Sequence, residues 1–156
     1  MSRSSDEFAE RMGSALTQAG LPRVPSLVFS ALLVDENGRM TSAALSDGLE
    51  LSAGSISGAV RYLEQVGMVR RERERGSRRD VYVVDDDAWH GAMMRRDQMY
   101  APMVAALNAG LVGVDADSRV HQRLLLTREF LLFVDQELAN LADKWEKRRT
   151  ELNLSE

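Results

Sequence analysis

Residues 40–84 read MTSAALSDGLELSAGSISGAVRYLEQVGMVRRERERGSRRDVYVV, and this stretch decides the fold. Thr41 and Ser52 are good N-caps because their hydroxyls can accept hydrogen bonds from the free backbone N–H groups of a first helical turn. They predict two consecutive helices, 42–49 and 53–66. The short segment between them predicts a helix–turn–helix.

A β-hairpin is predicted to follow these helices. Residues 68–75 alternate loosely as a strand does, Gly76-Ser77 forms a turn, and the β-branched and aromatic run 81–84 is the returning strand. Helix, helix and hairpin in this order are typical of a winged helix.

The second predicted helix has two different faces. One is apolar at helical spacing and is expected to be buried: Ile56, Ala59, Val60 and Leu63. The opposed face is small and polar and ends in a guanidinium: Gly54, Ser57, Gly58 and Arg61. Each glycine costs a helix about 1 kcal/mol relative to alanine. Either close approach of the helix to DNA or tight helix packing inside the protein would offset that cost.

Charge is distributed unevenly along the chain. The net charge is -4, yet residues 61–79 hold seven arginines and three glutamates. Such asymmetry is the electrostatic footprint of a nucleic-acid binder, although a solvated basic face would look the same. Arg71, Arg73 and Arg75 share one strand face, which we expect to turn toward phosphates, and an arginine at the hairpin tip can enter a minor groove. The predicted DNA contacts are Thr41, Ser52, Gly54, Ser55, Ser57, Gly58, Arg61, Arg73, Arg75, Arg78 and Arg79.

These residues resemble the DNA-binding core of MarR-type winged helix-turn-helix regulators. The GbsR-like branch is the most similar, through Gly-Ser-Ile-Ser at 54–57, Leu-Glu-Gln-Val-Gly at 63–67 and Gly-x-Arg-Arg-Asp at 76–80. The preceding run ERMGSALTQAGLPRVPSLVFSALLV also resembles that branch. The resemblance implies a homodimer on a palindromic double-stranded operator, and repression or activation tuned by a small effector. Ala44 and Gly48 depart from the pattern, since an acidic residue and a helix former are usual there.

Flanking helices complete the predicted architecture, which is mainly α with a small β-hairpin. Helices are expected from Asp6 to Ala19 and from about Pro22 to Val34, and a long helix after Asp85 should kink or divide at Pro102. We expect one compact domain of three segments: N-terminal helices for dimerisation and support at 1–38, the DNA-binding region at 39–85, and C-terminal helices for dimerisation and an effector pocket at 86–156.

The last predicted helix, which runs to about Arg149, has the clearest periodicity. Its apolar residues follow a heptad spacing with one polar interruption: Val120, Leu124, Thr127, Leu131, Val134, Leu138, Leu141 and Trp145. A second apolar set, Leu126, Phe130 and Phe133, lies off that seam. A helix that is apolar on two sides must be covered on two sides, by its own domain and by a partner subunit. The predicted dimerisation residues are Phe8, Met12, Leu131, Val134, Leu138, Leu141 and Trp145.

A cluster of methionines and aromatics could bind an effector. Methionine adapts to irregular ligands, and aromatic faces attract cations. The candidates are Trp89, Met93, Tyr100 and Met103, for which ordinary core packing is the alternative.

Other function classes lack their signatures. There is no cysteine, and His90 and His121 stand apart from any metal-ligand spacing, so neither a metal nor a cofactor is expected. No catalytic motif occurs, and the chain is predicted not to be an enzyme. Without a long apolar run or a signal region, no membrane association and a cytoplasmic location are expected. The alternative to a DNA-binding regulator is a winged-helix adaptor whose basic hairpin contacts an acidic protein.

Overall fold

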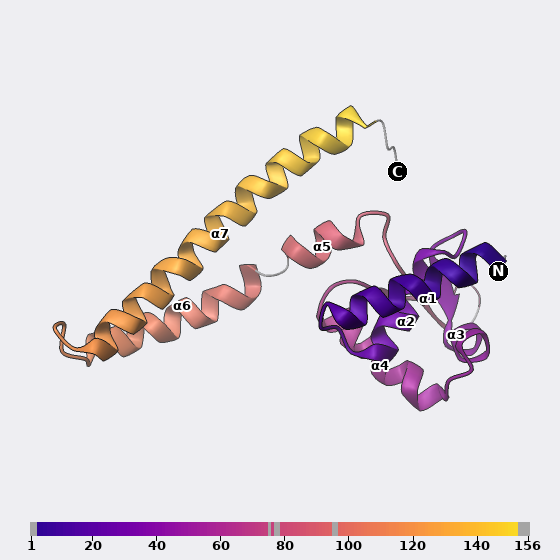
Figure 1. Ribbon diagram of the computed structural model, residues 1–156, viewed down its shortest axis with the longest axis horizontal. Coiled ribbons are helices and arrows are strands. Elements are labelled where there is room, and N and C mark those ends of the chain that lie inside the picture. Colours follow the sequence, from indigo (N-terminus) through magenta and orange to yellow (C-terminus); the bar gives the residue numbers. More distant parts are fainter. Residues whose placement is uncertain (1–2, 75, 77–78, 95–96, 153–156) are drawn as a thin grey trace. The chain divides into compact units, whose positions relative to one another are not determined.

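The computed structural model describes residues 3–74, 76, 79–94 and 97–152, and the side chains in these ranges except those at 3–4, 93–94 and 97–99. The chain divides into two compact units, Met1–Trp89 and His90–Glu156 (Figure 1). The helix α5 (Ala88–Met94) carries the chain from the first unit into the second.

The first unit has the helix–helix–hairpin order that the sequence predicts. Its elements are α1 (Arg3–Gln18), α2 (Arg23–Leu33), β1 (Arg39–Thr41), α3 (Ser42–Leu49), α4 (Ala53–Gln65), β2 (Arg70–Arg73) and β3 (Asp80–Val83). Both predicted caps are confirmed, because the Thr41 hydroxyl accepts from the Ala44 amide and the Ser52 hydroxyl from the Ser55 amide, each at 3.1 Å. The fold class is confirmed as a mainly helical winged helix-turn-helix.

The sheet has three antiparallel strands in the order β1-β3-β2, one strand more than the predicted hairpin. In the central strand, Tyr82 lies opposite Met40 on one side and Arg71 on the other. Gly38 immediately precedes β1 and has a φ of 61°, in the left-handed region. Its carbonyl accepts a hydrogen bond from the Val84 amide at 2.8 Å, which joins the start of β1 to the end of β3. A strand of three residues is too short to show a periodicity of two, so the sequence pattern could not reveal it.

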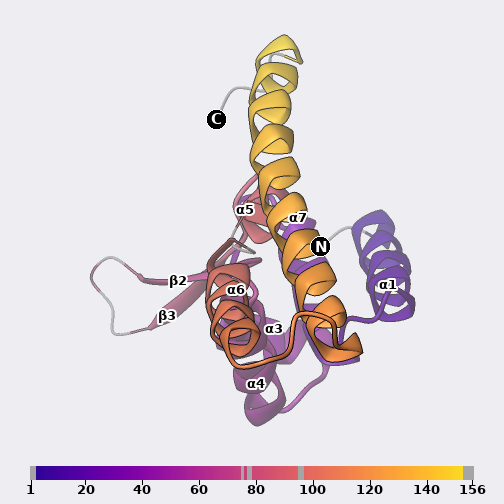
Figure 2. The same ribbon diagram turned by 90° about the vertical axis from the view of Figure 1, so that its left-hand side faces the viewer.

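Helix α2 supplies much of the core of this unit. Its Phe29 and Leu32 are fully buried, together with Leu45 of α3 and Leu63 of α4. Helix α1 packs on α2 through Gly13, where a Cβ atom would lie only 3.0 Å from the Leu27 side chain. The hairpin of β2 and β3 extends beyond the helices α3 and α4 of its unit (Figure 2).

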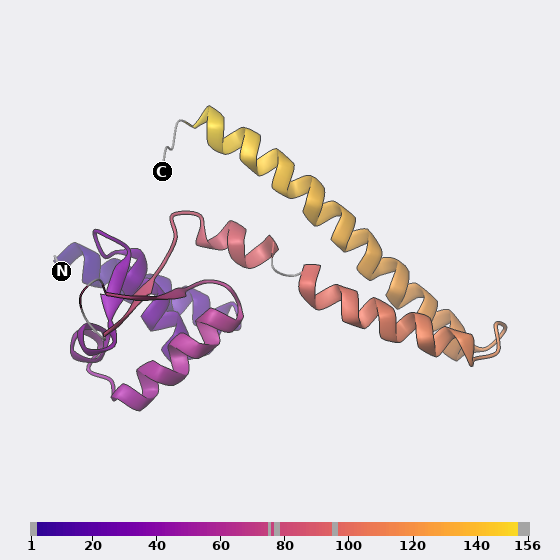
Figure 3. The same ribbon diagram turned by 180° about the vertical axis from the view of Figure 1, so that it is seen from behind.

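The second unit contains α6 (Asp97–Val112) and α7 (Arg119–Glu151), which lie side by side as an antiparallel pair (Figure 3). Gly110 allows close packing, since a Cβ there would lie 3.5 Å from Leu124. The expected division at Pro102 is wrong, because α6 continues through this residue. Pro102 is the sixth residue of α6, so the backbone N–H that would bond the carbonyl four residues earlier is missing there, and the helix continues without this hydrogen bond. Among the described residues, no helix is long and apolar enough to cross a membrane.

Candidate nucleic-acid interface

Helix α4 presents its two predicted faces as expected. Ile56, Ala59, Val60 and Leu63 are buried, and each is 3% exposed or less. The opposed stripe of Gly54, Ser57, Gly58 and Arg61 is exposed throughout. The helix is therefore anchored in the core on one side and offers the other to a partner.

The two glycines of this stripe are not explained by packing inside the first unit. A Cβ atom added at Gly58 would meet nothing within 4 Å, and one added at Gly54 would meet only the Ser52 hydroxyl, at 3.9 Å. Nothing in the described part of the chain therefore requires either residue to lack a side chain. Packing within the first unit therefore does not account for their helix-propensity cost.

The hydroxyls near the start of α4 differ in what they already bind. The Ser52 and Ser55 hydroxyls lie 2.9 Å apart, and Ser52 also caps the helix. Thr41 is half-buried and caps α3. The exposed Ser57 hydroxyl forms no hydrogen bond with the residues that the structure describes. Ser57 is thus the hydroxyl in this group that remains fully available to a ligand.

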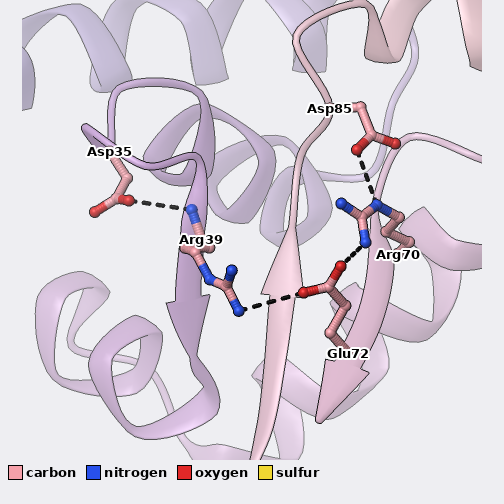
Figure 4. A network of polar contacts seen from close by, with 5 residues as sticks. All are labelled: Asp35, Arg39, Arg70, Glu72 and Asp85. Carbon is pink, nitrogen blue, oxygen red and sulfur yellow. Dashed lines mark hydrogen bonds and ion pairs between the residues drawn. The ribbon is translucent and has the colours of Figure 1, made fainter. Parts of the chain in front are cut away.

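Two exposed arginines of the sheet, Arg39 and Arg70, form ion pairs within the first unit. Figure 4 shows Arg39 of β1 and Arg70 of β2 both paired with Glu72, and Arg70 also donates from Nε to Asp85 at 2.8 Å. The Asp35 carboxylate in turn accepts from the Arg39 amide at 3.1 Å. This network links β1, β2 and the segment that follows β3.

Arg71 is also held within the first unit. Its guanidinium lies 3.7 Å from Glu64 of α4 and 3.5 Å from Asp80 of β3, and it stacks over the Tyr82 ring at 5.8 Å. Arg71 thus already has acidic partners, while the expectation that Arg71, Arg73 and Arg75 face phosphates remains a prediction. Alternation along a strand predicts which face a side chain takes but not which acidic groups of other elements meet it there.

Arg61 and Arg73 are the arginines of this stretch that stay exposed and form no ion pair within the described residues. They come from α4 and from β2. Arg79 is also exposed, whereas the predicted contacts Arg75 and Arg78 lie outside the described residues. An exposed helix face with an uncompensated arginine, next to a hairpin with another, has the chemistry to bind a polyanion.

Two protein-family models match separate parts of this chain, and together they span most of its length. A MarR family model matches residues 19–80, and the model of the MmpR5-like MarR family transcriptional regulators matches residues 87–148. The chain belongs to the MarR family of transcriptional regulators. A MarR-family regulator binds DNA and is not an enzyme, as the sequence predicted.

One curated relative and one solved structure are similar to this chain. The regulator is 27% identical over 146 residues to the HTH-type transcriptional regulator MmpR5 of Mycobacterium tuberculosis, covering 93% of this chain and 88% of that one. A crystal structure of a transcriptional regulator shares the fold with a TM-score of 0.81 at 24% identity, covering 92% of this chain and 99% of that one.

The residues predicted for dimerisation of the regulator occupy different environments. Leu131 is buried at 8% exposure, while Val134, Leu138, Trp145 and Met12 are half-buried. Phe8 and Leu141 are exposed. The most exposed apolar face of α7 is the second set, Leu126, Phe130 and Phe133, at 72%, 62% and 62%.

The predicted effector residues of the regulator lie in both units. Trp89 packs its ring edge-on against Phe29, with the ring centroids 5.7 Å apart, so it contributes in part to the core of the first unit. Tyr100 is half-buried and Met103 exposed, both on α6. The side chain of Met93 lies outside the described residues. An effector pocket at these residues remains a prediction.

Sequence reasoning missed the acidic partners of the basic hairpin. Arg39 of β1 pairs with Glu72 of β2 across the central strand β3, and Arg70 of β2 pairs with Asp85, which follows β3, so these contacts depend on the strand order of the sheet (Figure 4). The alternation of arginine and glutamate in β2 could have indicated these ion pairs. It places Glu72 where basic side chains of neighbouring strands can reach it.

Proposed function

We propose that this MarR-family regulator is a homodimer that reads a palindromic operator through α4 and the β2–β3 hairpin, and that a small effector releases it. A repressor is the form of regulation we favour. The observation that carries the proposal is the exposed stripe of α4, with no close contact at either glycine and an Arg61 guanidinium that forms no ion pair with any described residue.

The stripe suits a DNA groove for steric and chemical reasons. Gly54 and Gly58 let the helix backbone approach base edges or phosphates closely, Ser57 can donate to either, and Arg61 can reach a phosphate or a guanine edge. Arg73 would bind the backbone beside the groove, with Arg75, Arg78 and Arg79 as further predicted contacts. In a binding-competent dimer the two copies of α4 would stand roughly 34 Å apart, one turn of B-DNA.

The apolar face of α7 supports the homodimer. Leu126, Phe130 and Phe133 follow one another at spacings of four and three, so they form one continuous stripe. Large exposed apolar patches mark interaction sites. A second copy of the same helix is the partner we propose, with Leu141 and Phe8 as further contacts.

The branch within the family also remains part of the proposal. The resemblance of residues 8–84 to the GbsR-like branch is a prediction from their motifs, while residues 87–148 match the MmpR5-like model. The match to MmpR5 extends over 93% of the chain, so it includes most of the segment on which the GbsR-like prediction rests.

Footprinting on the DNA that flanks the gene, followed by titration at several salt concentrations, tests the proposal. We expect a protected palindrome whose affinity falls steeply with salt. Arg61→Ala and Arg73→Ala should each weaken binding and reduce the salt slope by about one. Arg70→Ala is the control, since this arginine is already paired with Glu72 and Asp85.

A winged-helix adaptor is the competing function. If the protein were such an adaptor, footprinting would show no protected DNA segment, and the Arg61→Ala and Arg70→Ala variants would not differ in DNA affinity. Normal operator binding by a folded Arg61→Ala, Arg73→Ala double variant would refute the proposed interface.

A further inference from the structure

A groove in the first unit lies away from the proposed DNA contacts. It has a volume of about 810 Å³ and is formed by α1, α2, β1 and the end of α3. Of the residues that the structure describes, none from α4 or the β2–β3 hairpin lines it. Its volume falls within the range of roughly 300–1,000 Å³ that is usual for small-molecule sites.

The groove combines an apolar wall with a charged rim. Ala9, Leu27, Ala31, Met40 and Leu49 supply apolar side chains, of which Ala9 and Ala31 are buried and the others half-buried. Such a surface would accept the hydrocarbon part of a ligand, since burial of apolar area is favourable.

Carboxylates dominate the charged rim. Asp6 and Glu10 come from α1 and Glu50 from the end of α3, while Arg23 is the single cation among the described residues that line the groove. Within the described part of the chain, none of the three carboxylates takes part in an ion pair or a side-chain hydrogen bond. This contrasts with the hairpin, where Glu72 and Asp85 are matched by arginines.

Glu50 occupies its place at a conformational cost. It ends α3 with a φ of 53°, in the left-handed region where glycine or asparagine is usual. A glycine there would relieve the backbone and remove a carboxylate from the groove.

We propose that this groove binds amphipathic organic cations, whose apolar body lies along α1 and α2 and whose ammonium group lies near Glu10 and Glu50. The charge balance of the rim excludes anions as the preferred class, and the apolar wall disfavours small hydrophilic cations. This site is separate from the effector residues predicted at Trp89, Met93, Tyr100 and Met103. It does not depend on DNA binding and is tested without DNA.

Calorimetric titration of the full chain with decyltrimethylammonium, below its micelle concentration, tests the charge requirement. We expect saturable binding, with 1-decanol about threefold to tenfold weaker and decanoate weaker still. The Glu10→Gln, Glu50→Gln double variant should bind decyltrimethylammonium about as weakly as the wild type binds 1-decanol. Glu36→Gln is the matched control, because Glu36 is exposed but does not line the groove.

A second variant tests the location. Gly48 lines the groove and a Cβ there would meet nothing within 4 Å, so Gly48→Leu should fill the groove without a clash. We expect this variant to melt no lower than the wild type and to lose binding of the quaternary ammonium.

Three results would overturn the proposal: no saturable binding to the wild type, unchanged binding to both variants, or equal affinity for the cation and decanoate. A change in the oligomeric mass of Gly48→Leu, measured by light scattering, would also overturn it, because the groove would then be a contact between subunits.

Discussion

Replacement of Gly58 by alanine should make the regulator more stable and a worse DNA binder. A methyl group at this position would meet no protein atom within 4 Å, so it brings no steric cost within the first unit. The stability gain is then the difference in helix propensity, about 0.8–1 kcal/mol. For a chain of this size that corresponds to a rise in Tm of roughly 2–4 °C.

The effect on DNA has the opposite sign. The methyl group would project from the exposed stripe of α4, between Gly54 and Arg61, and would hold the helix away from the groove. We expect a loss comparable with one mismatched base pair, about 1–3 kcal/mol, or roughly 5-fold to 150-fold in Kd. Thermal denaturation followed by circular dichroism measures the first effect, and fluorescence anisotropy with the footprinted fragment measures the second.

Gly48→Ala is the control for this experiment. An added methyl group at Gly48 would also meet open space, but this residue lies in α3 and away from the stripe. The substitution should raise the Tm and leave DNA affinity unchanged. A Gly58→Ala protein that is stabilised and binds its operator as tightly as the wild type would refute the assignment of this stripe to DNA. A Gly58→Ala protein that is less stable than the wild type would contradict the observation that a methyl group fits at this position without a clash.

Three further substitutions test other parts of the structure. Gly38→Ala should cost more than about 1 kcal/mol in chemical denaturation, because φ is 61° and the new Cβ would lie 2.9 Å from the Val84 carbonyl oxygen; an unchanged midpoint would contradict this backbone conformation. Phe130→Glu should shift the mass in light scattering from dimer to monomer with helix content retained, since Phe130 is 62% exposed; an intact dimer would exclude this face as the interface. Leu131→Ala should instead lower the free energy of unfolding by about 2–4 kcal/mol, since Leu131 is buried; a change below about 1 kcal/mol would contradict that burial.

The local features of this protein could be predicted from sequence because they depend on neighbours in the chain. The caps at Thr41 and Ser52 need only an amide three residues ahead. The two faces of α4 follow from a period of 3.6 residues. The same reasoning expected the helix to kink or divide at Pro102, and the division is wrong, because a single proline removes one hydrogen bond while the other turns of α6 keep theirs.

Sequence by itself determined the winged helix, the orientation of α4 and the excess of arginine beside it. Tertiary structure decided which of these arginines have acidic partners within the protein. Arg70 and Arg71 are neutralised by Asp85, Glu64 and Asp80, which the fold brings from other elements, whereas Arg61 and Arg73 form no ion pair within the described residues. The physical reason is that the charge of an arginine is known from its residue type, whereas the strength of an ion pair depends on the distance to an acidic group. Those distances are set by the packing of strands and helices that are far apart in the sequence.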